Sequence, residues 1–327
     1  MSDWSFLVPP GISVTLRARS KPALLARCLG DETAPAANRT LLLDFTAAGD
    51  GPGAPARGRY KGIPWRCRVD ARPEGSCTLA FRSPLLREYL ALHIALLPAL
   101  RRLLLERNVA LVLGAAFASA EAATVLSGET GSGKTAALLA ALASGAQVIG
   151  DEFVGIAATG EVAPVLRVLA LRRATLAAAP RLRPSPARRR QLRAAALAAT
   201  LSGGRLDPLV HVSPTELGVS VAGHAARLST LIWLERADVP APRREPIDAA
   251  QVIDAIARAQ AGHDGAYAVP GTLGMGEKDV SRWRETLARA LRDVQCLRVA
   301  LPPGSIATDA LRDLVTPPPE AIARPSP

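Results

Sequence analysis

The sequence has little of what would indicate a metal centre, a disulfide framework or a membrane span. Its four cysteines form no C-x-x-C pair and its four histidines lie far apart, so no metal-ligand spacing is present. The first residues lack a basic segment followed by a long apolar one, and no charge-free run reaches roughly 18 strongly apolar residues. We therefore expect a soluble protein without a targeting segment, in the reducing cytoplasm.

Aromatic residues are also scarce, at 4% of the chain, whereas the formal net charge is +11. Basic stretches interleaved with aromatics, which are typical of single-stranded nucleic-acid binding, are absent. An acidic peptide or protein partner accounts for the same excess of positive charge, so nucleic acid is not the favoured partner. The densest basic segment, Arg181–Arg193, could clamp a transferring phosphate or grip an acidic substrate, or could be a solvated surface loop.

Short apolar runs separated by Gly- and Pro-rich connections predict a small β-rich region over residues 1–80. Apolar residues at helical spacing predict a long helix over 83–108, bent at Pro98. Further strands are expected at 109–118, 123–127, 147–152, 228–234 and 296–301, and further helices at 136–143, 249–260, 281–294 and 308–314. Residues 180–193 are expected to form a mobile surface connection. Of the histidines, His93 is expected in the core, and His211, His224 and His263 in loops.

A glycine-rich segment between the second of these strands and the next helix fits the pattern G-x-x-x-x-G-K-[ST] at every position. It reads Gly128, Glu129, Thr130, Gly131, Ser132, Gly133, Lys134 and Thr135. The glycines allow backbone torsions that direct successive N–H groups at an anion, and the following helix N-terminus adds its dipole. Lysine supplies a charge for the β- and γ-phosphates, and the threonine hydroxyl can ligate magnesium. The segment predicts a site for ATP and Mg²⁺.

Two carboxylates end the very next predicted strand, at Asp151 and Glu152. They are expected beside the glycine loop, at the carboxyl edge of the sheet where ligands bind. One carboxylate can hold the metal ion or its water, and another can accept the proton of an attacking hydroxyl. A solvated strand end or a helix cap is the alternative interpretation of the pair.

The compact order of glycine loop, helix and paired-acid strand resembles the HPr kinase/phosphorylase family and its relatives with a phosphoenolpyruvate-carboxykinase-like nucleotide domain. The resemblance is specific over about residues 109–156, and it is closest to the HPr-kinase-related serine kinases that carry Asp-Glu. It implies an α/β (α+β) fold with a P-loop kinase domain over 109–316, preceded by a β-rich domain over 1–82 and a connecting helix over 83–108. Residues 317–327 are expected to be a disordered tail.

The resemblance also implies roles for the acids. Asp151 would be the base that polarises a substrate serine hydroxyl, while Glu152 and Thr135, with Asp151, would handle magnesium. Relatives commonly place a histidine in the strand before the loop, in a Leu-His-Ala-Ala-like setting, where this chain has Gly114. Glycine has no side chain to orient a carboxylate or contact phosphate, so activity would depend on another group or be reduced.

These observations favour an ATP-dependent kinase that transfers the γ-phosphate to a serine of a peptide or protein. The resemblance also implies a suitable acceptor, namely a ribosomally synthesised precursor peptide such as a lasso-peptide precursor. A nucleotide-binding regulatory module and a small-molecule kinase are the alternatives. An ABC ATPase or a helicase is disfavoured, because Leu234-Glu235 ends its strand in a single acid and Asp-Glu-Phe-Val is not a helicase box. The oligomeric state is left open, a homo-oligomer included.

Overall fold

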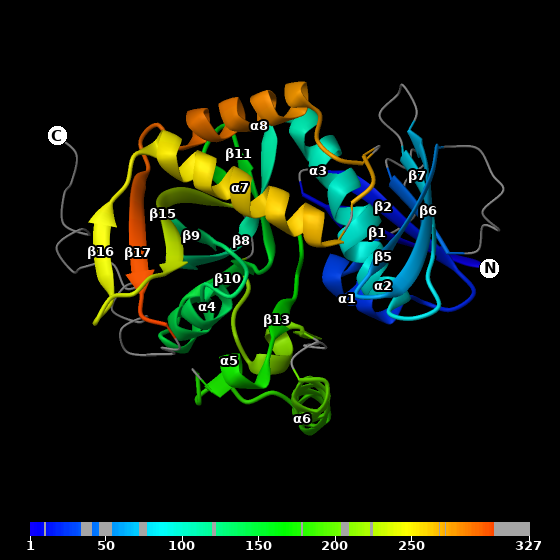
Figure 1. Cartoon of the computed structure of the whole chain (residues 1–327), viewed down its shortest axis with the longest axis horizontal. Helices are drawn as coiled ribbons and strands as arrows, with labels where there is room; N and C mark the ends of the chain where they lie inside the picture. The colour runs from blue at the N-terminus through cyan, green and yellow to red at the C-terminus, as the bar shows by residue number, and fades with distance from the viewer. Residues whose placement is uncertain are drawn as a thin grey trace.

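The computed structural model describes residues 1–9, 11–33, 41–45, 54–71, 77–119, 122–177, 179–203, 209–222, 225–267, 269–271 and 273–303. The chain is a mixed α/β protein built around two large sheets (Figure 1). The helix expected at 308–314, the tail expected at 317–327 and His224 lie outside the described residues. Within the described part of the chain, no helix combines the length and the apolar character needed to cross a membrane.

The N-terminal sheet has the strand order β3-β1-β2-β4-β7-β6-β5. Its strands are β1 (Ser2–Val8), β2 (Ile12–Ala18), β3 (Glu32–Thr33), β4 (Leu41–Asp44), β5 (Ala54–Tyr60), β6 (Ile63–Ala71) and β7 (Cys77–Arg82), with helix α1 (Ala23–Leu29) after β2. Burial alternates along β7, as expected for a sheet with one face in the core. The β-rich character expected for this region is confirmed.

A continuous helical segment follows this sheet in the chain and packs against its apolar face. It consists of α2 (Arg87–Ala91), the π-helical turn η1 (Leu92–Leu96) and α3 (Leu97–Glu106). Pro98 is the second residue of α3, and because the helical segment continues before it, its missing N–H removes one backbone hydrogen bond. The sequence predicted a bend at this proline, and the structure shows the irregularity as a π-helical turn immediately before it.

The second sheet has the order β10-β8-β11-β12-β15-β17-β16, with β9 between β8 and β15. Its strands are β8 (Val109–Ser119), β9 (Ala122–Gly128), β10 (Gln147–Gly150), β11 (Phe153–Ala157), β12 (Glu161–Pro164), β15 (Ala226–Arg236), β16 (Arg243–Pro246) and β17 (Gln295–Leu301). β8 is buried along nearly its whole length because helices cover both faces of the sheet. These are α4 (Lys134–Ala143) on one face and α7 (Ala249–Tyr267) with α8 (Glu277–Ala290) on the other (Figure 1).

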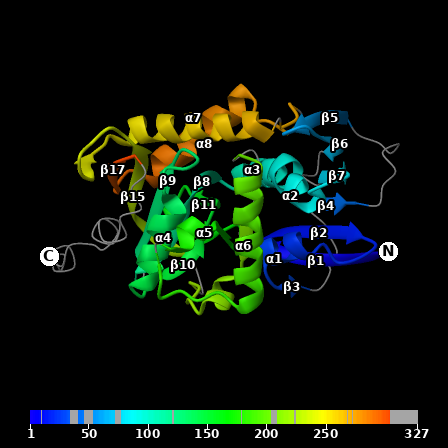
Figure 2. The ribbon, with the colours of Figure 1, turned by 60° about the horizontal axis from the view of Figure 1, so that its bottom comes forward.

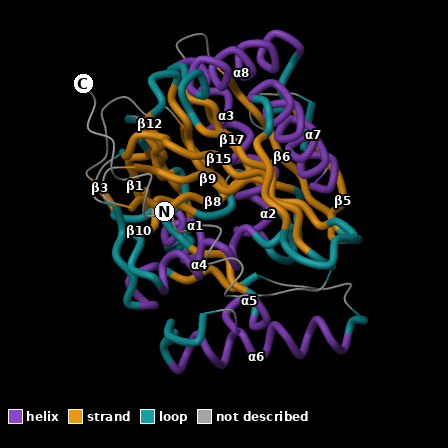
Figure 3. Tube along the Cα trace, turned by 90° about the vertical axis from the view of Figure 1, so that its left-hand side faces the viewer, coloured by secondary structure: helices purple, strands orange, loops and turns teal. Residues whose placement is uncertain are grey.

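The remaining elements lie beyond α4. They are the ribbon of β13 (Leu169–Leu171) and β14 (Val210–Val212), the helices α5 (Arg173–Ala177) and α6 (Pro186–Leu201), and the 3-10 turn η2 (Pro214–Leu217). Figure 3 shows α6 at the bottom of the molecule, below the sheet strands. The expectation of a mobile connection over 180–193 is wrong for its second half. Ser185 caps α6 by accepting a hydrogen bond from the Arg188 backbone N–H, and Pro186 begins the helix.

One of the hydrophobic clusters spans both sheets. The buried cluster that contains the apolar face of the N-terminal sheet and the helical segment 87–106 also contains Leu111 and Leu113 of β8 and Phe153 of β11. An ion pair reinforces the junction, since the buried Arg101 of α3 donates to both carboxylate oxygens of Asp264 on α7, at 2.6 and 2.9 Å. Figure 2 shows the N-terminal sheet beside the C-terminal end of α7.

Candidate active site

The glycine loop lies between the end of β9 and the start of α4. Gly128, Gly131 and Gly133 all have positive φ, at 152°, 87° and 108°. A Cβ atom on Gly128 would lie 2.2 Å from the carbonyl oxygen of Leu234 on the neighbouring strand β15. The positive φ therefore favours glycine at all three positions, and the close approach of β15 additionally excludes a side chain at Gly128.

The lysine and the serine of the loop fit an anionic ligand. Lys134 Nζ donates to the carbonyl oxygens of Gly128 and Glu129, at 2.8 Å each, so its ammonium group is held over the loop. Burial lowers its pKa to about 8, although the neighbouring carboxylates act to raise it. Ser132 is 3% exposed, and its Oγ has no hydrogen-bond partner among the described residues. Glu129 and Thr130 are exposed at the loop tip.

Asp151 lies directly against this loop. It follows β10, whose pairing with β8 shifts register between Val148 and Gly150. Thr135 Oγ1 donates to Asp151, with 3.2 Å to each carboxylate oxygen, and the backbone N–H of Ala170 donates to Oδ2 at 3.0 Å. Asp151 is 2% exposed, and burial together with the charge of Glu152 raises its pKa to about 6. A carboxyl group that titrates near neutral pH beside a phosphate-type loop is suited to exchange a proton there.

The Glu152 carboxylate contacts strand β14 and not the hydroxyl of Thr135. The residue's φ of 65° is in the left-handed region, and its Oε2 lies 3.2 Å from Nε2 of His211 on β14. Burial acts to raise the pKa of Glu152, but the hydrogen bond from His211 and the charges of the surrounding histidines lower it to about 2. The two consecutive acids therefore contact different strands. Asp151 accepts a hydrogen bond from the backbone N–H of Ala170 on β13, and Glu152 contacts His211 on β14, the cross-strand partner of Ala170.

The placement of His211 corrects the expectation that it is a loop residue. It is a strand residue, 4% exposed, and it contacts one member of the predicted acid pair. Sequence reasoning missed this contact because the two residues are 59 positions apart and no motif links them. His263 was also expected in a loop and lies instead on α7.

Glu152 borders a cluster of rings at the junction of the two sheets. The cluster contains all three tyrosines of the chain and three of its four histidines: Tyr60, Tyr89, Tyr267, His93, His211 and His263. His93 is in the core, as predicted, and burial lowers its pKa to about 3. Neither ring nitrogen of His93 has a hydrogen-bond partner among the described residues.

Gly114, at the position where the family that the sequence resembles commonly has histidine, has no space for a side chain. It pairs with Ser127 across β8 and β9, and a Cβ atom on it would lie 2.7 Å from the carbonyl oxygen of Leu126. Its backbone N–H donates to the carbonyl oxygen of Glu152 at 2.9 Å. The glycine is thus part of the strand packing that positions the acid pair.

The arginines of 181–193 are distributed over a turn and a helix. Arg188 of α6 donates to Glu216 of η2 at 2.9 Å and to Gln191 of α6 at 2.6 Å, so its guanidinium group is bound to neighbouring side chains of the same region. Arg189, Arg190 and Arg193 are exposed. Nothing in these contacts directs the segment at the glycine loop.

The described residues contain no group of three or more His, Cys, Asp and Glu side chains arranged as a metal site. A magnesium ion bound through Thr135 and Asp151 would then take further oxygen ligands from phosphate or water, as magnesium does in nucleotide sites. The chain matches no known family model and none of the curated proteins.

Proposed function

We propose that this chain is an ATP-dependent kinase of the HPr-kinase-like type, with a P-loop domain, that transfers the γ-phosphate to a serine hydroxyl of a peptide or protein. One observation carries the proposal: Asp151, whose carboxyl has a raised pKa, lies within 3.2 Å of the hydroxyl of Thr135 in a complete phosphate-binding loop. Phosphoryl transfer requires mainly positioning and charge neutralisation, and a loop, a lysine and a carboxylate supply these.

The residues have distinct tasks in this proposal. The N–H groups of Gly128–Thr135 and the ammonium group of Lys134 bind the phosphates, and the orphaned hydroxyl of Ser132 gains a partner there. Thr135 and Asp151 would hold magnesium, which supplies charge neutralisation when bound. Asp151 accepts the proton of the acceptor hydroxyl, and its pKa near 6 keeps it ionised at pH 7.

Glu152 and His211 act on the geometry of the site in this scheme. The hydrogen bond between them fixes Glu152 in its left-handed conformation, and the peptide that links the two acids then presents Asp151 to Thr135. Thr135, Glu152 and Asp151 were all expected to hold magnesium. We assign this role to Thr135 and Asp151 alone, because Thr135 donates to Asp151 whereas Glu152 contacts His211.

The proposal is tested by incubating the protein with labelled ATP, magnesium and serine-containing peptides. Lys134→Ala is expected to abolish nucleotide binding and transfer, and Asp151→Asn to abolish transfer while retaining most nucleotide binding. Lys278→Ala on α8 and Asp254→Asn on α7 are the controls, because both side chains lie outside the site. Transfer by Asp151→Asn at the wild-type rate would refute the base assignment.

A regulatory module that binds nucleotide without transferring phosphate is the second candidate, and Gly114 is the observation that favours it. β8 contributes no side chain at the position where relatives have histidine. This function predicts tight ATP binding by calorimetry with every acceptor left unmodified. Phosphorylation of a metabolite in the absence of peptide would instead indicate a small-molecule kinase.

A further inference from the structure

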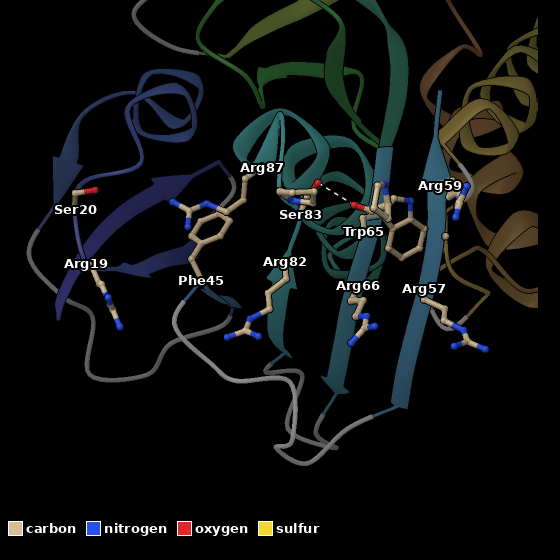
Figure 4. Close-up of a pocket in the computed structure, with 13 residues that line it drawn as sticks. Arg19, Ser20, Phe45, Arg57, Arg59, Trp65, Arg66, Arg82, Ser83 and Arg87 are labelled. Atoms are coloured by element: carbon tan, nitrogen blue, oxygen red, sulfur yellow. Dashed lines mark hydrogen bonds between the residues drawn. The ribbon is translucent and has the colours of Figure 1, made fainter. Parts of the chain in front are cut away.

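A concave site lies on the N-terminal sheet, on strands that carry none of the glycine-loop or acid residues. It is a pocket of about 890 Å³, and no acidic residue lines it (Figure 4). Six arginines do: Arg19, Arg57, Arg59, Arg66, Arg82 and Arg87. Figure 4 shows Arg57, Arg66 and Arg82 on neighbouring strands with their side chains directed the same way.

The strand register sets three of these arginines side by side. Arg57 of β5 pairs with Arg66 of β6, and Arg66 pairs with Arg82 of β7. Like charges directly opposite each other destabilise a sheet. Within the described part of the chain, none of the three has an ion-pair partner. Among the described residues this row of positive charge has no counter-charge, and an anionic ligand would complement it.

The features around the row suit a peptide better than a nucleic acid. Nucleic-acid grooves offer exposed aromatic rings for base stacking, but the two aromatic side chains here, Phe45 and Trp65, are 7% and 2% exposed. The guanidinium of Arg87 already covers the Phe45 ring, 5.0 Å from its centroid.

β5 is also the last strand in the order of its sheet, so one side of its backbone pairs with no strand among the described residues. An extended peptide can add to such an edge through main-chain hydrogen bonds.

We propose that this pocket binds an acidic peptide segment, whose carboxylates pair with Arg57, Arg66 and Arg82 where the segment crosses β5, β6 and β7, and whose end can reach the edge of β5. Guanidinium and carboxylate groups match in a bidentate geometry, so the Glu and Asp side chains of such a segment can pair with these arginines. That the bound peptide is also the phosphate acceptor rests on the proposed function, whereas binding itself does not.

The test is fluorescence anisotropy without nucleotide, so its outcome does not depend on kinase activity. The probe is a fluorescein-labelled peptide of about ten residues in which Glu alternates with Ser, compared with the same peptide carrying Gln. The variant is the triple R57Q/R66Q/R82Q. The matched control is R189Q/R190Q/R193Q, which removes the same charge from three exposed arginines of α6. The single variant Arg66→Glu, at the centre of the row, is measured as well.

The Glu peptide is expected to bind and the Gln peptide to bind much more weakly, with affinity for the Glu peptide falling as salt is raised. The pocket triple should weaken binding roughly tenfold or more and the α6 triple by less than about twofold. Arg66→Glu should weaken binding like the pocket triple, which keeps the test valid if that triple does not fold.

Five results would overturn the proposal. Wild-type protein could bind the Glu and Gln peptides equally, or bind neither. Both triples could lose affinity to the same extent, which would show that only total charge matters. The α6 triple alone could lose affinity, which would place the peptide at α6. A single-stranded oligonucleotide of equal charge could bind the pocket more tightly than the Glu peptide, which would identify a different occupant.

Discussion

Replacing Gly114 by alanine is the sharpest test of how the strand packing supports the glycine loop. A Cβ atom at this position would lie 2.7 Å from the carbonyl oxygen of Leu126, whereas carbon and oxygen atoms in close contact lie about 3.3 Å apart or more. β8 and β9 must therefore separate by roughly half an ångström. Overpacking of this kind typically costs about 1–3 kcal/mol in free energy of unfolding. Histidine is larger, so Gly114→His should cost at least as much.

The displacement would also reach the active site. Ser127, the cross-strand partner of Gly114, directly precedes the glycine loop, and its Oγ donates to the carbonyl oxygen of Leu113 at 2.8 Å. We expect Gly114→Ala to weaken ATP binding along with stability. Urea unfolding monitored by circular dichroism gives the free energy, and calorimetry gives the affinity.

The control is Gly155→Ala on the adjacent strand β11, where the new Cβ would meet the Val109 Cγ1 methyl at 3.1 Å. A side-chain methyl can rotate away, so this change should stay within about 1 kcal/mol. The reasoning fails if Gly114→Ala is as stable as wild type, or if Gly114→His binds ATP and transfers phosphate faster than wild type.

Three further predictions concern single groups. Burial raises the pKa of Asp151 from 3.8 to about 6, so the ionised carboxyl destabilises the folded state increasingly as pH rises from about 4 to 6. The free energy of unfolding of Asp151→Asn, measured by urea unfolding, should exceed that of wild type by about 1–3 kcal/mol at pH 7 and should equal it below about pH 4. His211→Ala leaves the buried Glu152 carboxylate without its partner and should lower the free energy of unfolding at pH 7 by about 1–3 kcal/mol. This loss of stability should shrink as pH falls from about 4.5 towards 2, because Glu152 becomes protonated over that range. An undiminished loss at pH 3 would contradict the prediction. Gly262→Ala, in α7 with open space around the site of the new Cβ, should raise the thermal unfolding midpoint through about 0.5–1 kcal/mol of stabilisation, and a lower midpoint would show that the helix requires glycine there.

The sequence predicted best where the signal is local. The glycine loop and its neighbours combine a buried strand, the fixed residue spacing of the loop pattern and a helix, and β9 and α4 lie where that pattern placed them. The start of α6 was missed although Ser185 and Pro186 form a helix N-terminus, because the run of prolines and arginines was interpreted as a loop.

The divergence of the acid pair could not be predicted from the sequence, since glutamate rarely adopts the left-handed conformation that Glu152 has. His211 contacts this residue only through the pairing of β13 with β14, which forms after chain segments distant in sequence come together. The arginine row likewise depends on strand register, and the sequence shows only scattered arginines before that register is known.

The core shared by the two sheets bears on how the protein can be dissected. A fragment beginning near residue 109 would expose Leu111, Leu113 and Phe153, which are packed against the N-terminal sheet and the helical segment 87–106. A fragment ending there would expose the other half of the same surface, including Leu96 and Leu100. Such apolar surfaces promote aggregation, so neither half is suited to separate expression, and truncation experiments would report misfolding before they reported function.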